Sequence, residues 1–128
     1  MAQRILIAED NVALSSVLRF SLEAAGFEVE VARNGRIAWE MFQESAFDLL
    51  ITDQQMPEMT GTELCQKITE AHDAAPMPIV LLTAKGMELD LSELSKSLGI
   101  SAAYPKPFSP AQIVEVVNGL LSAAPQAS

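Results

Sequence analysis

Residues Leu49-Leu50-Ile51-Thr52-Asp53 form a short apolar run that ends in a carboxylate, and this run gives the first indication of the fold. Two similar runs lie at Ile5–Ala8 and Ile79–Leu82. Short, nearly continuous apolar runs are typical of parallel strands that are buried on both faces of a sheet. We therefore predict a central strand at each of these three positions, with Asp53 at the end of one of them.

Weaker segments complete the predicted fold. Glu28–Ala32 alternates charged and branched residues, as an edge strand does, and a short last strand is expected at Ala102–Tyr104. Helical periodicity occurs between and after the strands, and a helix is expected to end near Gly26 and another to start at Ser109-Pro110. The expected core positions of the first, third, fourth and fifth helices are Leu14, Val17, Leu18 and Leu22; Leu64, Ile68 and Ala71; Leu91, Leu94 and Leu98; and Ile113, Val116, Val117, Leu120 and Leu121. Alternating strands and helices predict a doubly wound α/β fold with a mostly parallel five-stranded sheet and helices on both faces.

Length and charge restrict the class of protein. The chain has 128 residues, of which 49% are hydrophobic, and a formal net charge of -9. This composition supports one buried core, and we expect one domain over residues 1–122 with a short flexible tail over residues 123–128. The acidic charge argues against direct nucleic-acid binding, which depends on clustered Lys and Arg.

The single cysteine and the apolar pattern indicate a compartment. Cys65 has no partner for an internal disulfide, and the N-terminal residues do not have the pattern of a signal peptide. No apolar run approaches the roughly 20 residues that span a bilayer. We therefore expect a cytoplasmic protein that does not insert into membranes.

Polar side chains occur at the predicted carboxyl ends of the strands, where open α/β sheets bind their ligands. The first strand is followed by Glu9-Asp10, the third ends at Asp53, the fourth at Thr83, and the fifth precedes Lys106. Each of these residues has an ordinary explanation by itself, as a solvated turn, a helix cap or a surface lysine. Their coincidence at one edge of a sheet instead favours a common site.

The chemistry of this set fits phosphoryl transfer with magnesium. Mg²⁺ prefers oxygen ligands and relieves the repulsion between crowded carboxylates. A carboxylate such as Asp53 can attack phosphorus and form an aspartyl phosphate. The Lys106 ammonium would then neutralise phosphoryl oxygens, and the Thr83 hydroxyl would donate a hydrogen bond to one of them.

Four motifs carry a resemblance to a known family. They are Ala8-Glu9-Asp10-Asn11, the run Asp53-Gln54-Gln55-Met56-Pro57-Glu58-Met59-Thr60-Gly61, Thr83-Ala84, and Lys106-Pro107-Phe108. In this order and spacing, the chain resembles the receiver domain of two-component response regulators, of the chemotaxis-regulator type, from Arg4 to about Leu121. The resemblance implies the flavodoxin-like sheet order 2-1-3-4-5.

The resemblance also implies roles in phosphorylation. Asp53 would be the phosphoacceptor and, with Asp10, a ligand of Mg²⁺. Glu9 would bind the ion, directly or through water, and Gln55 would offer its backbone carbonyl. A sensor histidine kinase or a phosphotransfer protein would supply the phosphoryl group.

A switch is implied in the same way. Thr83 and Tyr104 match the family's switch pair, in which the hydroxyl moves to the phosphate and the ring turns inward. The Lys106-Pro107 bond would be cis, which orients the lysine. Pro105 departs from the family, which usually has an aliphatic residue after the switch aromatic, and it stiffens Tyr104 toward an extended geometry.

The predicted function is a phosphorylation-dependent signalling switch. Phosphorylation would change the surface of the fourth helix, fifth strand and fifth helix for a downstream partner. The domain would catalyse only its own phosphorylation and dephosphorylation, so we do not expect an enzyme with an outside substrate. Gln55 and Lys85 would set the lifetime of the phosphoryl group, because in the family these positions flank the path of the attacking water. Neither is an acid that activates water, so slow to intermediate hydrolysis is expected. The fifth helix offers Glu115 and no base, so we expect a monomer or a weak dimer.

Three other functions are open to a chain of this kind. One is a docking module that keeps the fold and does not switch, against which the intact set of site residues argues. Another is a carboxylate-nucleophile phosphatase, which typically has a second Asp where this chain has Gln55. The third is a flavodoxin-like cofactor binder, whose first strand-to-helix loop should be rich in Ser, Thr and Gly to cradle a phosphate, whereas Glu9-Asp10 would repel that phosphate.

Overall fold

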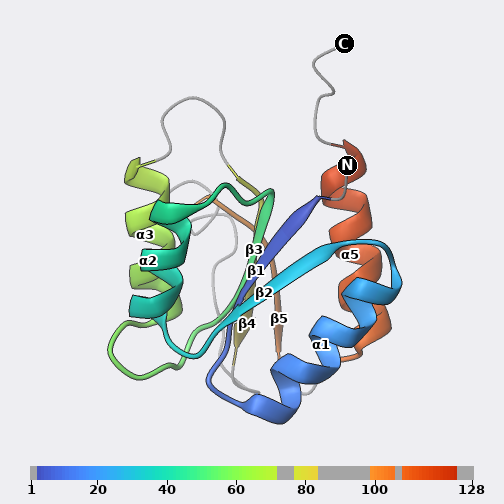
Figure 1. Cartoon of the computed structure of the whole chain (residues 1–128), viewed down its shortest axis with the longest axis horizontal. Coiled ribbons are helices and arrows are strands. Elements are labelled where there is room, and N and C mark those ends of the chain that lie inside the picture. Colours follow the sequence, from blue (N-terminus) through green and yellow to red (C-terminus); the bar gives the residue numbers. More distant parts are fainter. Residues whose placement is uncertain (1–2, 72–76, 84–98, 106–107, 124–128) are drawn as a thin grey trace.

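The computed structural model describes residues 3–71, 77–83, 99–105 and 108–123 (Figure 1). Within these ranges the elements are β1 (Arg4–Ala8), α1 (Val12–Ala24), β2 (Glu28–Ala32), α2 (Gly35–Glu44), β3 (Leu49–Asp53), α3 (Gly61–Ala71), β4 (Ile79–Thr83), β5 (Ile100–Pro105) and α5 (Pro110–Ala123). All five predicted strands are present, each within two residues of its expected bounds. The fourth helix, expected around residues 91–98, lies outside the described residues.

The sheet is parallel and has the order β2-β1-β3-β4-β5, which confirms the predicted topology. β2 pairs with one edge of β1 and β3 pairs with the other edge. The strand order therefore reverses between β1 and β3. Every residue of β3 and β4 is buried, as expected for central strands, while β2 is an edge strand with exposed Glu28 and Glu30. The carboxyl ends of β1 and β3 therefore adjoin at the point where α/β sheets bind their ligands.

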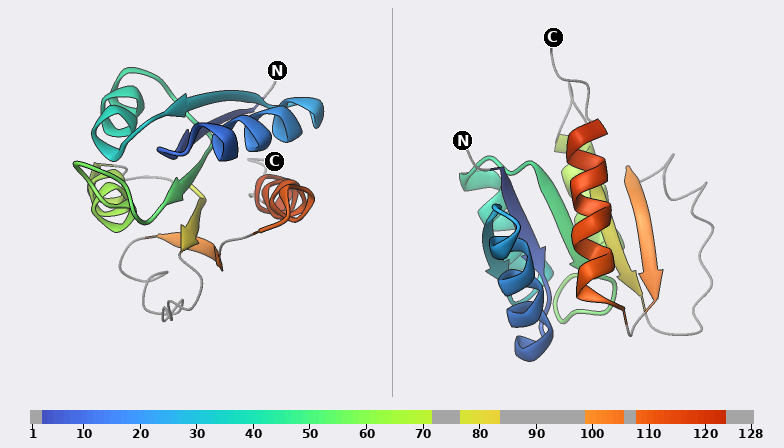
Figure 2. Two further views of the ribbon diagram at one scale, coloured as in Figure 1. Left: turned by 90° about the horizontal axis from the view of Figure 1, so that it is seen from below. Right: turned by 90° about the vertical axis from the view of Figure 1, so that its right-hand side faces the viewer.

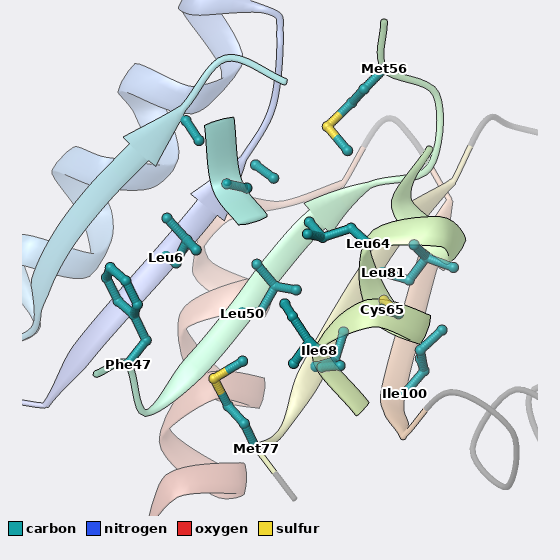
Figure 3. Packing of buried hydrophobic residues seen from close by; sticks show 14 residues of the cluster. Leu6, Phe47, Leu50, Met56, Leu64, Cys65, Ile68, Met77, Leu81 and Ile100 are labelled. Carbon is teal, nitrogen blue, oxygen red and sulfur yellow. The ribbon is translucent and has the colours of Figure 1, made fainter. Parts of the chain in front are cut away.

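Two helical layers cover the sheet (Figure 2). On one face, α1 and α5 pack over a buried cluster that includes Ile7, Leu82 and Val117. On the other face, α2 and α3 pack over a second cluster, the α2/α3 cluster, in which Leu64 and Cys65 lie near Leu50 and Leu81 (Figure 3): its buried members are Leu6, Ala8, Ala32, Ala38, Phe47, Leu50, Met56, Leu64, Cys65, Ile68, Met77, Ile79, Leu81 and Ile100. Burial raises the pKa of the Cys65 thiol to about 12, so this side chain is a neutral part of the core.

Helix ends follow the predicted signals more closely than helix faces do. Residue Gly26 has φ 100° just after α1, and the Ser109 hydroxyl accepts a hydrogen bond from Gln112 N at 3.4 Å at the start of α5. The predicted inner face of α1 is partly wrong, because Val17 is 48% exposed and Ser15 is buried instead. Ser15 lies about one helical turn before the buried Leu18 and about two turns before the buried Leu22, and Val17 is turned away from that stripe. In α3, Leu64 and Ile68 are buried as predicted, but Ala71 is exposed at the end of the helix.

The register between β4 and β5 contains an irregularity near its start. Ile79 is opposite Ile100, but the next residue, Val80, is opposite Ala102, so β5 contains one extra residue, Ser101. Beyond this bulge, Leu82 is opposite Tyr104 and Thr83 is opposite Pro105. The bulge thus places Tyr104 beside the end of β4.

Candidate functional site

Three carboxylates converge at the adjoining ends of β1 and β3. Oxygen atoms of Glu9, Asp10 and Asp53 all lie within 4.8 Å of one another. Glu9 is 1% exposed and Asp53 is 4% exposed, whereas Asp10 is open to solvent. Backbone hydrogen bonds fix Glu9, because its N–H donates to Ala32 O at 3.0 Å and its carboxylate accepts from Asn11 N at 3.1 Å. An all-oxygen set with one solvent-facing member fits a hard divalent cation that keeps part of its water shell.

The backbone around Asp53 is held on two sides. Gln54 N donates to Leu82 O of β4 at 2.9 Å, and Gly61 N donates to Gln54 O at 2.9 Å. A Cβ at Gly61 would collide with the backbone carbonyl oxygen of Asp53 and lie 2.9 Å from Gln54 Cα. Gly61 therefore lets the first turn of α3 pack directly against the residue that carries the central carboxylate.

Side chains at the start of α3 fix the end of the β3–α3 loop. Gln54 accepts from Thr62 N at 2.9 Å and donates to the Thr62 hydroxyl at 3.2 Å. Thr60 and Glu63 form a capping box, in which Glu63 N donates to the Thr60 hydroxyl at 3.2 Å and Thr60 N donates to the Glu63 carboxylate at 2.9 Å. The backbone and hydroxyl hydrogen bonds from Thr60 lower the pKa of Glu63.

The middle of this loop is attached to the second helical layer. Gln55 is exposed, directly after it Met56 is buried in the α2/α3 cluster, and the carboxylate of Glu58 contacts the start of α2. Glu58 also has φ 71°, which a residue with a side chain rarely adopts. The loop after Asp53 is therefore an ordered structure rather than a loose connection.

The predicted switch pair is in direct contact. Thr83 is 3% exposed at the end of β4, and its hydroxyl donates to the backbone carbonyl of Tyr104 at 3.4 Å. The Tyr104 ring is half-buried against the cluster under α1 and α5, and Pro105 is exposed on the edge strand. A hydrogen bond of this length is weak, so the hydroxyl can exchange it for a stronger acceptor.

Three of the predicted site residues, Lys85, Lys106 and Pro107, lie outside the described residues. The carboxylates lie together as predicted. Sequence reasoning missed Asn34 and Glu58, which join α2 to the loop after Asp53. Asn34 before a helix is a recognisable N-cap, but nothing in the sequence indicates its contact with a residue 24 positions away. Among the described residues, no helix combines the length and the apolar character that crossing a membrane requires.

Comparisons with known proteins agree with this geometry. The sequence model of the response regulator receiver domain matches residues 5–118. The phosphate regulon transcriptional regulatory protein PhoB of Rhizobium meliloti (strain 1021) is 38% identical over 126 residues, which cover 97% of this chain and 54% of PhoB. The chain spans about half the length of the curated relatives it matches.

Solved structures give the same result. The signal receiver domain of a signal transduction histidine kinase from Syntrophus aciditrophicus is 31% identical, with a TM-score of 0.85 over 99% of this chain and 96% of that one. Vibrio cholerae chemotaxis protein CheY4 is 28% identical, with a TM-score of 0.84 over 94% of this chain and 100% of that one. With the family match over most of its length and the 2-1-3-4-5 sheet, the chain belongs to the response regulator receiver domain family.

Proposed function

We propose that the chain is a phosphorylation-dependent signalling switch in which Asp53 is the phosphoacceptor. The observation that carries this proposal is the convergence of the Glu9, Asp10 and Asp53 carboxylates within 4.8 Å at the adjoining ends of β1 and β3. Asp53 is the member that ends the central strand β3, and the start of α3 packs against its backbone. A buried carboxylate in a fixed position is suited to act as a nucleophile toward phosphorus.

The donor set fits Mg²⁺, and we assign Asp10, Asp53 and the Gln55 backbone carbonyl as its protein ligands, with Glu9 next to them. When bound, the ion would neutralise the crowded carboxylates and the incoming phosphoryl oxygens. The chain would interact with a sensor histidine kinase or a phosphotransfer protein, and a downstream effector would bind it in the cytoplasm. We expect it to be a monomer or a weak dimer.

Two reactions would occur at Asp53. In the first, a carboxylate oxygen of Asp53 forms a bond to phosphorus while the bond from phosphorus to the donor's histidine nitrogen breaks, and that nitrogen keeps the electron pair. In the second, water attacks phosphorus and releases inorganic phosphate, which restores the carboxylate. Gln55 and Lys85 would set the rate of the second reaction, and Lys106, oriented by a cis bond to Pro107, would neutralise the phosphoryl oxygens. Both reactions act on the domain itself, so it would not turn over an outside substrate.

The signal would leave through Thr83. The Thr83 hydroxyl would exchange its long hydrogen bond to Tyr104 O for a charge-assisted bond to a phosphoryl oxygen. The space that the threonine vacates would then be available to the Tyr104 ring. The surface of the fourth helix, β5 and α5 would change as a result.

Incubation with acetyl phosphate and Mg²⁺ tests the proposal. Intact mass spectrometry should find one added phosphoryl group on the native chain and none on Asp53→Asn. Gain of a full phosphoryl group by Asp53→Asn would show that the acceptor is elsewhere. No gain by the native chain, with its fold intact, would favour a docking module that has lost the chemistry.

A further inference from the structure

The loop after Asp53 contains a strained turn. Met59 N donates to Pro57 O at 2.8 Å, and Glu58, between them, has φ 71°. A hydrogen bond from residue i+2 to residue i with a positive central φ is the mark of the rarer, strained kind of γ-turn. Glycine would adopt this backbone without strain, but the chain has a glutamate there, so the surrounding contacts must hold it.

Two side chains at the start of α2 provide those contacts. The Asn34 Nδ2 donates to Glu58 Oε2 at 3.1 Å, and Arg36 Nε donates to Glu58 Oε1 at 3.1 Å. Asn34 is only 9% exposed, and its Oδ1 accepts from Ile37 N at 2.8 Å as the N-cap of α2. Arg36 is exposed and also pairs with Glu40, so its contribution is small. One buried amide therefore caps a helix through its oxygen and holds the turn through its nitrogen.

The backbone reinforces this contact. A Cβ at Gly35 would lie 2.5 Å from Met59 O and 2.7 Å from Met59 Cβ, so the loop packs directly on the first turn of α2. At the other end of the same loop, Met56 is buried in the α2/α3 cluster (Figure 3). Gln55 lies between the fixed end of β3 and these two attachments. The direction of its backbone carbonyl is set by the backbone torsions of this loop, so the attachments restrict that direction.

We propose that Asn34 is a positioning residue of the phosphoryl site, which holds Glu58 and thereby fixes the loop that presents the Gln55 backbone carbonyl to the cation. This inference rests on the proposed function, because it takes the Gln55 carbonyl as a ligand of Mg²⁺. Groups that orient the ligands of a metal control its affinity although they never touch it. Here the orienting group is the N-cap of α2, a helix that contributes no ligand.

The contact can be broken and rebuilt without changing the size of either side chain. Asn34→Asp keeps an oxygen that caps α2, but it removes the donor and places two carboxylates against each other. Adding Glu58→Gln reverses the polarity of the pair, because the new amide at position 58 can donate to the new carboxylate at position 34. Its remaining oxygen can still accept from Arg36. The double variant also restores the net charge of the native chain.

The experiment compares the whole native chain, Asn34→Asp, the double variant Asn34→Asp/Glu58→Gln, and Glu40→Gln as a matched control. Glu40→Gln removes the other partner of Arg36 and leaves Glu58 untouched. Mg²⁺ affinity is measured by NMR titration at a temperature where all four are folded, and hydrogen exchange of the Met59 amide is measured without Mg²⁺. We expect Asn34→Asp to bind Mg²⁺ about tenfold more weakly, the low end of the effect of an outer-shell partner, and the Met59 amide to exchange faster. In the double variant, the Mg²⁺ affinity and the Met59 exchange rate should return to within roughly twofold of the native values. In Glu40→Gln, both should stay within that range from the start.

Two results would overturn the inference. Native Mg²⁺ affinity in Asn34→Asp would show that the contact does not position the site. Weak binding that persists in the double variant would show that position 34 affects the site without its contact to residue 58. Failure of the proposed function has a different signature: the Mg²⁺ titration of Asp53→Asn would be the same as that of the native chain. In that case the assignment to Mg²⁺ falls as well, and Met59 exchange alone decides whether Asn34 holds the turn.

Discussion

The Thr83 hydroxyl donates to the backbone carbonyl of Tyr104, 3.4 Å away, across the pair of strands β4 and β5. This contact links the end of a buried central strand to the backbone of the edge-strand residue whose ring is half-buried. Because the bond is long, a charged phosphoryl oxygen on Asp53 would be the better acceptor. The two proposed switch residues are thus already connected before any phosphate is present.

Thr83→Ala should uncouple Tyr104 from the site. With beryllofluoride and Mg²⁺, the NMR signals of Tyr104 should shift in the native chain and in Thr83→Ser, which keeps the hydroxyl. They should stay in place in Thr83→Ala, because no hydroxyl is left to change partner. A full response in Thr83→Ala would mean that the signal reaches Tyr104 by another route.

Pro105→Leu should enlarge the response of Tyr104. The proline fixes φ next to the switch residue and narrows the conformations of the strand, so Tyr104 is expected to be partly inward before phosphorylation. A pre-shifted switch has less to gain from its ligand. The measurement is the beryllofluoride-induced shift of Tyr104 in the native chain and in Pro105→Leu. Equal responses would make Pro105 a neutral edge-strand residue.

Gly61→Ala should damage the site, whereas Gly119→Ala should not. A Cβ at Gly61 collides with the backbone of Asp53, so α3 or Asp53 must move, and we expect a loss of about 1–3 kcal/mol of stability with slower phosphorylation. A Cβ at Gly119 meets nothing within 4 Å, and alanine there should stabilise α5 by about 0.5–1 kcal/mol. Urea unfolding and acetyl phosphate labelling measure both effects. Tolerance of Gly61→Ala in both assays would contradict the close packing at Asp53.

Glu58→Ala should destabilise the chain more than Glu58→Gly does. Both variants lose the contacts with Asn34 and Arg36, but alanine keeps the steric penalty of the positive φ while glycine removes it. The expected difference in unfolding free energy is about 1 kcal/mol, measured by urea denaturation. If alanine is as stable as glycine, the turn has relaxed to a negative φ.

Glu63→Gln should flatten the dependence of stability on pH in acid. The hydrogen bonds from Thr60 lower the pKa of Glu63 below its usual 4.5 in the folded chain. Its contribution is therefore fully present above the unfolded pKa and is lost as pH falls through the folded pKa. Glutamine can keep the capping box, so the stability at neutral pH should change little. Urea unfolding from pH 7 to about pH 3 checks this, and an unchanged slope would exclude Glu63 as a contributor.

The sequence predicted the fold well because its strongest signals are local. Three runs are so apolar that they can only be central strands: Ile5–Ala8, Leu49–Thr52 and Ile79–Leu82. The polar residues that follow these runs in the sequence then lie together at one edge of the sheet. The strand order came from the family resemblance. The contact between Asn34 and Glu58 escaped prediction because it joins two loops, where no periodicity relates one residue to another. The burial of Val17 was predicted wrongly for another reason. Which positions of a helix are buried depends on the angle at which the helix packs on the sheet, and the sequence does not give that angle.

The extra residue in β5 decides on which face of the sheet the residues after it lie. Ile100 and Tyr104 are four positions apart, so in a regular strand they would face the same layer of helices. Ser101 breaks that count: Ile100 belongs to the α2/α3 cluster, while Tyr104 packs against the cluster under α1 and α5. A β5 that kept Ser101 but paired with β4 without the bulge would keep every residue of the proposed switch, yet it would turn the tyrosine to the opposite side of the sheet. Signalling would then depend on the register of two neighbouring strands as much as on the identity of their residues.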